Sequence, residues 1–216
     1  MNAVGSHRMS DPHAMTAVMT IQDPDPAWMR GLFRAKEVPN GHRGRISVKQ
    51  FARGLYSNSS RGEVPNTLAV LYRCPSAIAS LDTALWLHGV LEREPDPIWI
   101  SIPRNIRKPY LPPLRIEALR FSRVPTAEDI TATYQLVDLK RFPVFELAKT
   151  AVDFIRVRER VGLAHVEAML DLIVPKHVTP DQLRACAARH RASYPVERYL
   201  WRMRDHLAAK MQIDRA

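Results

Sequence analysis

The sequence predicts an α+β protein in which a small basic N-terminal unit precedes a middle part of helices and strands and a final run of helices. Two observations support this prediction. Segments of strand character and segments of helix character are segregated along the chain, which favours α+β over a doubly wound α/β fold. The chain also has 216 residues, 46% of them hydrophobic, which is enough for one core and a small appendage.

The N-terminal part is rich in positive charge. Residues 1–25 have no hydrophobic period and end in Asp-Pro-Asp-Pro, so we expect them to be disordered. A helix is expected over 26–38, followed by strands within 45–56, where Gly54 indicates a bulge or bend. Residues 30–61 contain eight Arg and Lys residues and one acidic residue.

The middle part combines two helices with several strands. Asn66 is expected to cap a helix over 66–73, which Pro75 ends. A second helix is expected over 77–88, with Gly89 at its C′ position. β-Branched and aromatic residues predict strands over 97–105, 114–121, 131–139 and 142–145.

Four helices are expected after residue 146. The first runs to Arg160 and closes or bends at Gly162, and the second stops at Pro175. Thr179 caps the third, and Ser193 caps the fourth. The expected spans are 146–160, 163–174, 180–191 and 194–210.

Composition favours a polyanionic partner. The net charge is +10, with 25 Arg and 7 Lys, and a guanidinium fork can bind two phosphate oxygens at once. A GC-rich genome that places arginine on solvated helix faces would give the same composition, so charge alone leaves both interpretations open. The two cysteines form no CxxC motif, which argues against a disulfide scaffold or a Cys-rich zinc site. No apolar run approaches the roughly 18–20 residues that span a bilayer, so no membrane partner is expected.

No catalytic motif is present in the sequence. It contains no GxxxxGK[ST], GxGxxG or HExxH pattern and no Ser/His/Asp arrangement with nucleophile-elbow spacing. Asp82 and His88 are the best isolated candidates, although a histidine at a helix C-terminus is as readily structural. His165 is expected to be a satisfied helix histidine. We therefore predict no enzyme, no catalytic residue, no metal and no cofactor.

The helix expected after residue 146 carries an unusual density of charge. Its apolar residues form a broad stripe at helical spacing. Lys149 and Asp153 lie four residues apart on one face, and an exposed pair of this kind contributes about 0.2–0.5 kcal/mol. Arg156 and Arg160 lie on the other flank. A packed helix with a solvated charged face is one interpretation, and a phosphate-contacting or conformational role is the other.

Three stretches together resemble the AbiEi antitoxins of bacterial abortive-infection systems. They are CPSAIASLDTALWLHGV (74–90), PIWISIPRN (97–105) and FPVFELAKTAVDFIRVRERVGLAHVEAML (142–170). The resemblance covers residues 45–205, and VTPDQLRACAARHRASYPVERYL is similar to the closing helices of that family. The matching positions are Ser80, Ala84, Leu85, His88 and Gly89 in the first block, Trp99, Ile100, Ile102, Pro103 and Arg104 in the second, and Lys149, Thr150, Asp153, Arg156, Arg158, Gly162 and Leu163 in the third.

The resemblance implies a DNA-binding antitoxin of a type IV toxin–antitoxin system in the bacterial cytoplasm. Such a protein joins an N-terminal winged helix to an α+β domain, binds inverted repeats of double-stranded DNA in its own promoter and represses its operon. It also counteracts a nucleotidyltransferase-like toxin without a stable complex. Only one helix precedes the expected wing, so we divide the chain into a disordered 1–25, a partial winged-helix-like basic unit at 26–60 and an antitoxin domain at 61–216.

Two groups of candidate residues follow. We expect the hairpin cations to contact phosphates, the 26–38 helix to read bases, and a cluster after the 97–105 strand to extend the track. The DNA-binding candidates are Arg30, Arg34, Lys36, Arg43, Arg45, Lys49, Arg53, Arg104, Arg107 and Lys108. His88, Lys149, Thr150, Asp153 and Arg158 are motif residues with a structural or antitoxin role, and we expect Asp153 and its cationic neighbours to lock their helix to the preceding strands. The alternative function is a stand-alone antitoxin or interaction module that acts on the toxin or on RNA without sequence-specific DNA binding.

Overall fold

The computed structural model describes three short N-terminal strands and residues 65–204, apart from 122, 137–139 and 175. For the N-terminal strands and for residues 131–136, 140 and 141 only the backbone is described. The expectations for residues 1–25, Gly54, Pro175 and the end of the last helix beyond 204 lie outside this part.

The N-terminal strands form an antiparallel sheet in the order β1-β3-β2. They are β1 (Leu32–Arg34), β2 (Val48–Ala52) and β3 (Leu55–Asn58). The strands expected within 45–56 are confirmed, with a register shift between Gln50 and Ala52. The helix expected over 26–38 is wrong at 32–34, because Leu32–Arg34 pairs with residues 55–57 of β3. Pairing with a neighbouring strand outweighs the weak helical preference of this Leu-Phe-Arg segment.

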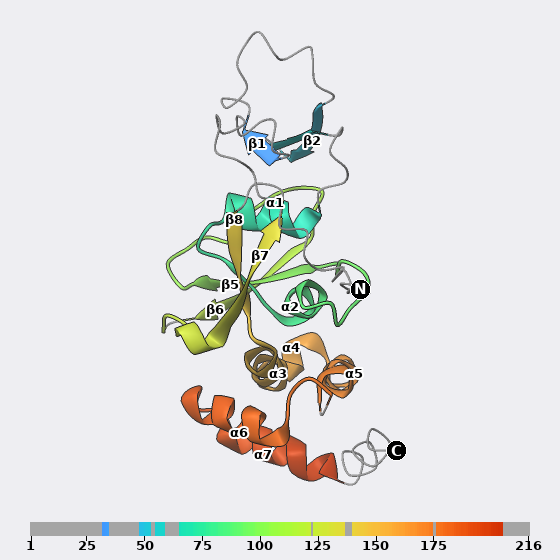
Figure 1. Cartoon of the computed structure of the whole chain (residues 1–216), viewed down its shortest axis with the longest axis vertical. Helices are drawn as coiled ribbons and strands as arrows, with labels where there is room; N and C mark the ends of the chain where they lie inside the picture. Colours follow the sequence, from blue (N-terminus) through green and yellow to red (C-terminus); the bar gives the residue numbers. More distant parts are fainter. Residues whose placement is uncertain are drawn as a thin grey trace, which may run out of the picture.

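The main sheet has five strands in the order β6-β5-β4-β8-β7 (Figure 1). Its strands are β4 (Ile78–Ala79), β5 (Ile98–Pro103), β6 (Ile116–Phe121), β7 (Ile130–Leu136) and β8 (Lys140–Phe145). β5–β6 and β4–β8 pair in parallel, whereas β4–β5 and β7–β8 are antiparallel. A helical run is thus joined to a mixed sheet, and the α+β prediction is confirmed.

The helix expected over 77–88 is partly wrong. Ile78 and Ala79 form the central strand β4, because β5 and β8 lie on either side and take its backbone hydrogen bonds. The helix α2 (Leu81–Leu87) begins only after Ser80. Gly89 follows with a φ of +74°, so the prediction of a glycine at C′ is confirmed.

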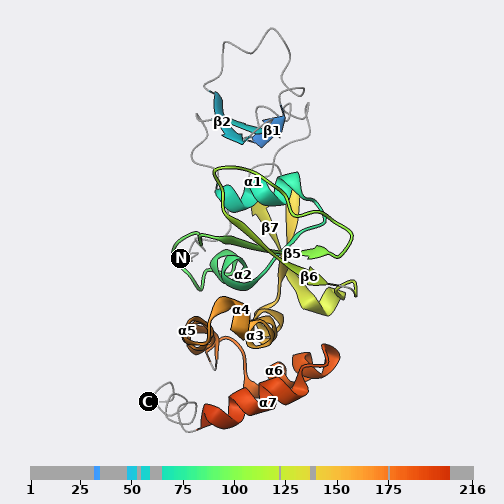
Figure 2. The ribbon, with the colours of Figure 1, turned by 180° about the vertical axis from the view of Figure 1, so that it is seen from behind.

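Alternating residues of β5 separate two hydrophobic cores. Ile98, Ile100 and Ile102 face α1 (Asn66–Arg73), whereas Trp99 packs with the C-terminal helices. Figures 1 and 2 show α1 on one side of the sheet and α3 to α7 on the other. The sequence predicted that the Asn66 side chain caps α1, and this prediction is wrong. Instead, the Glu94 carboxylate accepts hydrogen bonds from the backbone N–H of Asn66 and of Thr67.

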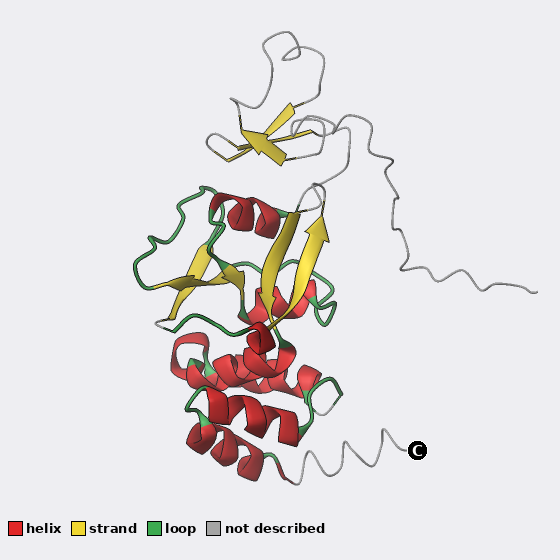
Figure 3. Ribbon diagram, turned by 60° about the vertical axis from the view of Figure 1, so that its left-hand side comes forward, coloured by secondary structure: helices red, strands yellow, loops and turns green. Residues whose placement is uncertain are grey.

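The C-terminal helices gather in one block (Figure 3) and follow the expected order, except that the single helix expected over 146–160 is interrupted at Val157 and forms two. They are α3 (Leu147–Arg156), α4 (Arg158–Val161), α5 (Leu163–Ile173), α6 (Pro180–Arg189) and α7 (Ser193–Arg202). Gly162 turns the chain with a φ of +99°, and Thr179 forms a capping box with Gln182. Ser193 is not a cap, because it is the first residue of α7 and Ala192 is the N-cap residue. None of the helices in the described residues is long and apolar enough to cross a bilayer.

Candidate functional site: an arginine-lined cavity

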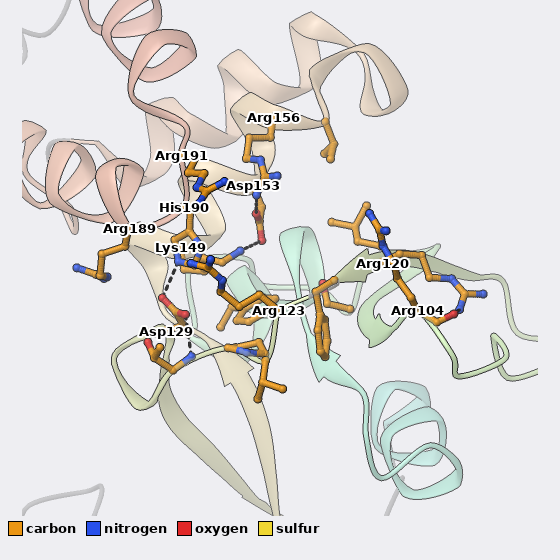
Figure 4. A pocket seen from close by; sticks show the side chains of 18 residues that line it. Arg104, Arg120, Arg123, Asp129, Lys149, Asp153, Arg156, Arg189, His190 and Arg191 are labelled. Atoms are coloured by element: carbon orange, nitrogen blue, oxygen red, sulfur yellow. Dashed lines mark hydrogen bonds and ion pairs between the residues drawn. The ribbon is translucent and has the colours of Figure 1, made fainter.

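A cavity of about 510 Å³ opens where the sheet meets the helical block (Figure 4). Four segments line it: the end of β5, the stretch from β6 to the short 3-10 helix η5 (Ala127–Asp129), one face of α3, and the α6–α7 turn. Its charged lining consists of seven cations against two carboxylates. The cations are Arg104, Arg120, Arg123, Lys149, Arg156, Arg189 and Arg191, and the carboxylates are Asp129 and Asp153.

Some of these cations already have partners. Arg120 donates from one guanidinium nitrogen to the carbonyl oxygens of Pro103, Arg104 and Ile106. This side chain ties the end of β6 to the loop that leaves β5. Arg189 pairs with Glu128 at 3.3 Å. Arg120 therefore fixes the backbone that carries Arg104.

Three other arginines have side chains without a partner among the described residues. The side chains of Arg104, Arg123 and Arg191 are exposed, and none of these guanidinium groups makes a hydrogen bond or an ion pair to another described residue. Arg191 also has a φ of +53°, in the left-handed region that side chains other than glycine rarely adopt. Arg191 is the C′ residue of α6, where its N–H donates to the Ala188 carbonyl and the Ala192 N–H donates to the Ala187 carbonyl, so the ordinary ending of the helix accounts for this φ. The cavity thus gathers free positive charge from three separate segments of the chain.

Lys149 and Asp153 form an ion pair in the wall of the cavity. Their side chains are only 8% and 9% exposed, so the interpretation of a solvated charged face is wrong for this pair. Arg156 approaches the same carboxylate at 3.9 Å. The Lys149 ammonium also lies 4.4 Å from the centre of the Phe145 ring at the end of β8. The ion pairs expected around Asp153 are therefore present, but they lie within α3, and the contact with the preceding strand is that of Lys149 with the Phe145 ring.

Asp129 and His190 form a second pair in the cavity wall. His190 Nε2 lies 2.7 Å from Asp129 Oδ1, and Asp129 is 1% exposed. Burial alone would raise the pKa of Asp129, but hydrogen bonds from the Thr126 backbone and from His190 outweigh burial and lower that pKa below its usual value. A carboxylate in this setting is charged, so the adjoining imidazole nitrogen donates.

Cys186 lies next to this pair. Ligand atoms of Asp129, Cys186 and His190 all lie within 4.8 Å of one another, and such a donor set could hold a zinc-like ion. Burial, however, raises the pKa of the Cys186 thiol to about 11, whereas metal binding requires the thiolate. Asp129 and His190 already satisfy each other, so we interpret the group as part of the packed wall.

Two motif residues, His88 and Thr150, contact the Phe145 carbonyl, whereas Lys149 and Asp153 line the cavity. His88 Nε2 lies 2.8 Å from the Phe145 carbonyl oxygen, and the Thr150 hydroxyl donates to that oxygen at 3.5 Å. Arg158 of α4 donates to the Ile155 carbonyl of α3 and therefore has a structural role at the junction of these two helices. Of the catalytic candidates, Asp82 pairs with His165 at 2.7 Å. His165 is therefore the satisfied histidine that the sequence predicted.

Among the predicted DNA-binding residues that the structure describes, Arg104 alone lines the cavity. Arg107 and Lys108 lie in the following loop, where Lys108 donates to the Ile116 carbonyl at 3.0 Å. Arg34 lies on β1 and Lys49 on β2. Arg30, Lys36, Arg43, Arg45 and Arg53 lie outside the described residues.

Sequence reasoning missed most of the cavity. It assigned no role to Arg120, Arg123, Asp129, Arg189, His190 or Arg191. The available signal was local: the Arg-His-Arg run at 189–191 and the Arg-x-x-Arg spacing at 120–123. Neither run shows that the two meet in space.

Comparison with known proteins gives little. No protein-family model and no curated protein matches the chain. Among solved structures, the crystal structure of the RV2827C protein from Mycobacterium tuberculosis is similar, with a TM-score of 0.46 and 19% sequence identity. The match covers 69% of this chain and 60% of that one, so this chain matches less than two thirds of that protein's length.

Proposed function

We propose that this chain is a DNA-binding antitoxin of the AbiEi type, which acts by binding rather than by catalysis. In this proposal it binds double-stranded DNA in its own promoter, represses its operon and counteracts a nucleotidyltransferase-like toxin. The motif resemblance supports the antitoxin part. The uncommitted arginines of the cavity support the nucleic-acid part.

The observation that carries the nucleic-acid part is the absence of described partners for Arg104, Arg123 and Arg191. An arginine that stabilises a fold is normally paired with a carboxylate or with carbonyl oxygens, as Arg120 is. Free guanidinium groups that face a common hollow remain available to a ligand. Phosphate oxygens are the ligand that a guanidinium fork binds best.

The N-terminal sheet is the proposed second contact with DNA. Arg34 and Lys49 belong to its strands, and the basic segment between residues 30 and 61 supplies the remaining cations. A β-ribbon can enter a groove as a helix does. Reading of bases by Arg34 would then come from a strand, since this residue is not helical.

The position of the arginines around a cavity also favours a second candidate, namely an antitoxin that recognises RNA or the toxin without sequence-specific DNA binding. Duplex-binding proteins place their cations on elements that enter a groove or follow the backbone. Here the free arginines surround a hollow instead. The two candidates differ in whether the upstream DNA of the operon is recognised.

Fluorescence anisotropy with a duplex from the chain's own upstream region, against a scrambled duplex, tests the promoter proposal. Tighter binding to the native duplex near physiological salt is expected. Equal binding that vanishes as salt rises would refute operator recognition and leave the second candidate. Co-expression with a toxin encoded beside the chain tests the antitoxin part, because growth should be restored. Continued growth arrest would contradict that part alone.

A further inference from the structure

We infer that the cavity binds a single unpaired nucleotide through its phosphate, either at the end of a single strand or as a free nucleoside phosphate. The inference rests on the proposed function only in assigning the cavity to phosphate ligands. It does not depend on operator recognition or on a toxin.

The size of the cavity fits one nucleotide. Its volume of about 510 Å³ lies in the range of small-molecule sites, roughly 300–1,000 Å³. A duplex is instead read by elements that enter a major groove about 12 Å wide. At a cavity the ligand enters the protein instead, which suits a nucleotide that projects from a strand.

The three arginines without described partners line the cavity from separate segments. Arg104 leaves β5, Arg123 follows β6, and Arg191 lies in the turn between α6 and α7. Cations that line one hollow from separate segments suit a ligand that enters the hollow, whereas cations spread along one element suit a polymer backbone. The carbonyl contacts of Arg120 hold the Arg104 backbone in place before any ligand arrives, which reduces the ordering cost of binding.

Part of the lining is apolar and suits a base. Phe121 is half-buried, and Val124 is 80% exposed although it is a large hydrophobic residue. Pro125 and Leu119 complete this part of the lining. Unpaired bases stack on aromatic and apolar side chains of this kind. A phosphate site beside an apolar wall distinguishes a nucleoside phosphate from inorganic phosphate alone.

The test uses a short single-stranded DNA oligonucleotide with a 3′ fluorophore, with and without a 5′ phosphate, and a duplex of the same sequence. The phosphorylated strand should bind about tenfold or more tightly than the unphosphorylated one, since one charge-assisted contact supplies that factor. Unlabelled AMP then separates the sources. Displacement of the strand by AMP indicates a free nucleotide as sufficient ligand, and no displacement indicates a strand end.

The variant Arg104→Ala/Arg123→Ala/Arg191→Ala should abolish the preference for the 5′ phosphate. Arg198→Ala is the control, because Arg198 is an exposed arginine that lines a different cavity beside α5 and α7. Arg123→Lys keeps the charge but loses the fork, and it should weaken binding even if the triple variant fails to fold. Equal binding of strand and duplex, insensitive to the phosphate and to Arg123→Lys, would overturn the inference whatever the promoter assay shows.

Discussion

Replacing Asp153 with alanine should destabilise the protein strongly, because the substitution leaves the Lys149 ammonium without its ion-pair partner inside the protein. The two side chains are 9% and 8% exposed, so solvent does little to screen the charge that remains. The Phe145 ring, 4.4 Å away, compensates only in part.

The magnitude follows from this burial. Removing one partner of a buried ion pair typically costs about 3–5 kcal/mol. For a chain of this size, about 2–4 °C of melting temperature corresponds to each kcal/mol. The expected decrease in melting temperature is therefore roughly 6–20 °C. Replacing both residues, as Lys149→Met with Asp153→Leu, should recover most of the loss, because no buried charge is left.

Thermal and urea unfolding followed by circular dichroism measure these differences. Asp181→Ala is the matched control, because Asp181 pairs with Arg184 on α6 but is 93% exposed, and it should leave the unfolding midpoint unchanged. A melting temperature of Asp153→Ala equal to that of the wild type would refute the structural role of the pair. So would a double variant less stable than the single one.

Three further predictions concern the cavity wall and the helices. Asp129→Asn should lower the free energy of unfolding at pH 7, because the lowered pKa of Asp129 means that its carboxylate stabilises the fold above the unfolded-state pKa. The difference between the two proteins should shrink as the pH falls below about 4, because this contribution is lost when the carboxylate is protonated. Urea unfolding of both proteins across this range measures it, and a difference that does not change with pH would contradict it. Burial raises the pKa of the Cys186 thiol to about 11, so this thiol should resist iodoacetamide at pH 8 until the protein is denatured. Mass spectrometry measures the labelling, and rapid labelling of the native protein would contradict the packing of Cys186 in the cavity wall. Thr179→Ala removes the hydroxyl that accepts from Gln182 N at 3.2 Å and should cost about 1 kcal/mol; an unchanged urea midpoint would show that the capping box contributes nothing.

The elements that the sequence predicted well are those with a strong local signal. β5 reads as a strand because Ile98, Ile100 and Ile102 alternate with residues that are also apolar or small, and a proline follows. α6 begins where Thr179, Pro180 and Gln182 form a capping box. In each case the decisive contacts lie within a few residues of one another.

The elements that the sequence predicted wrongly depend on distant partners. Ile78 and Ala79 continue the apolar period of α2, and only the flanking strands β5 and β8 make them a strand. β1 likewise exists through its pairing with β3. The cavity has the same origin, because Arg104, Arg123 and Arg191 line one hollow only after the sheet and helices have packed. A sequence shows that arginines are present, but not which of them lack a carboxylate.

The salt dependence of DNA binding tests the central claim most directly, namely that the free arginines of the cavity contact nucleic-acid phosphates. Anisotropy titrations of wild type, of the Arg104, Arg123 and Arg191 triple alanine variant, and of Arg198→Ala would be made at several salt concentrations with the same strand. The slope of log K against log salt should fall by about 0.7 in the triple variant, because the three arginines contact one phosphate and each single-strand phosphate accounts for roughly 0.7, and the slope should be unchanged in Arg198→Ala. Equal slopes in all three proteins would contradict the claim.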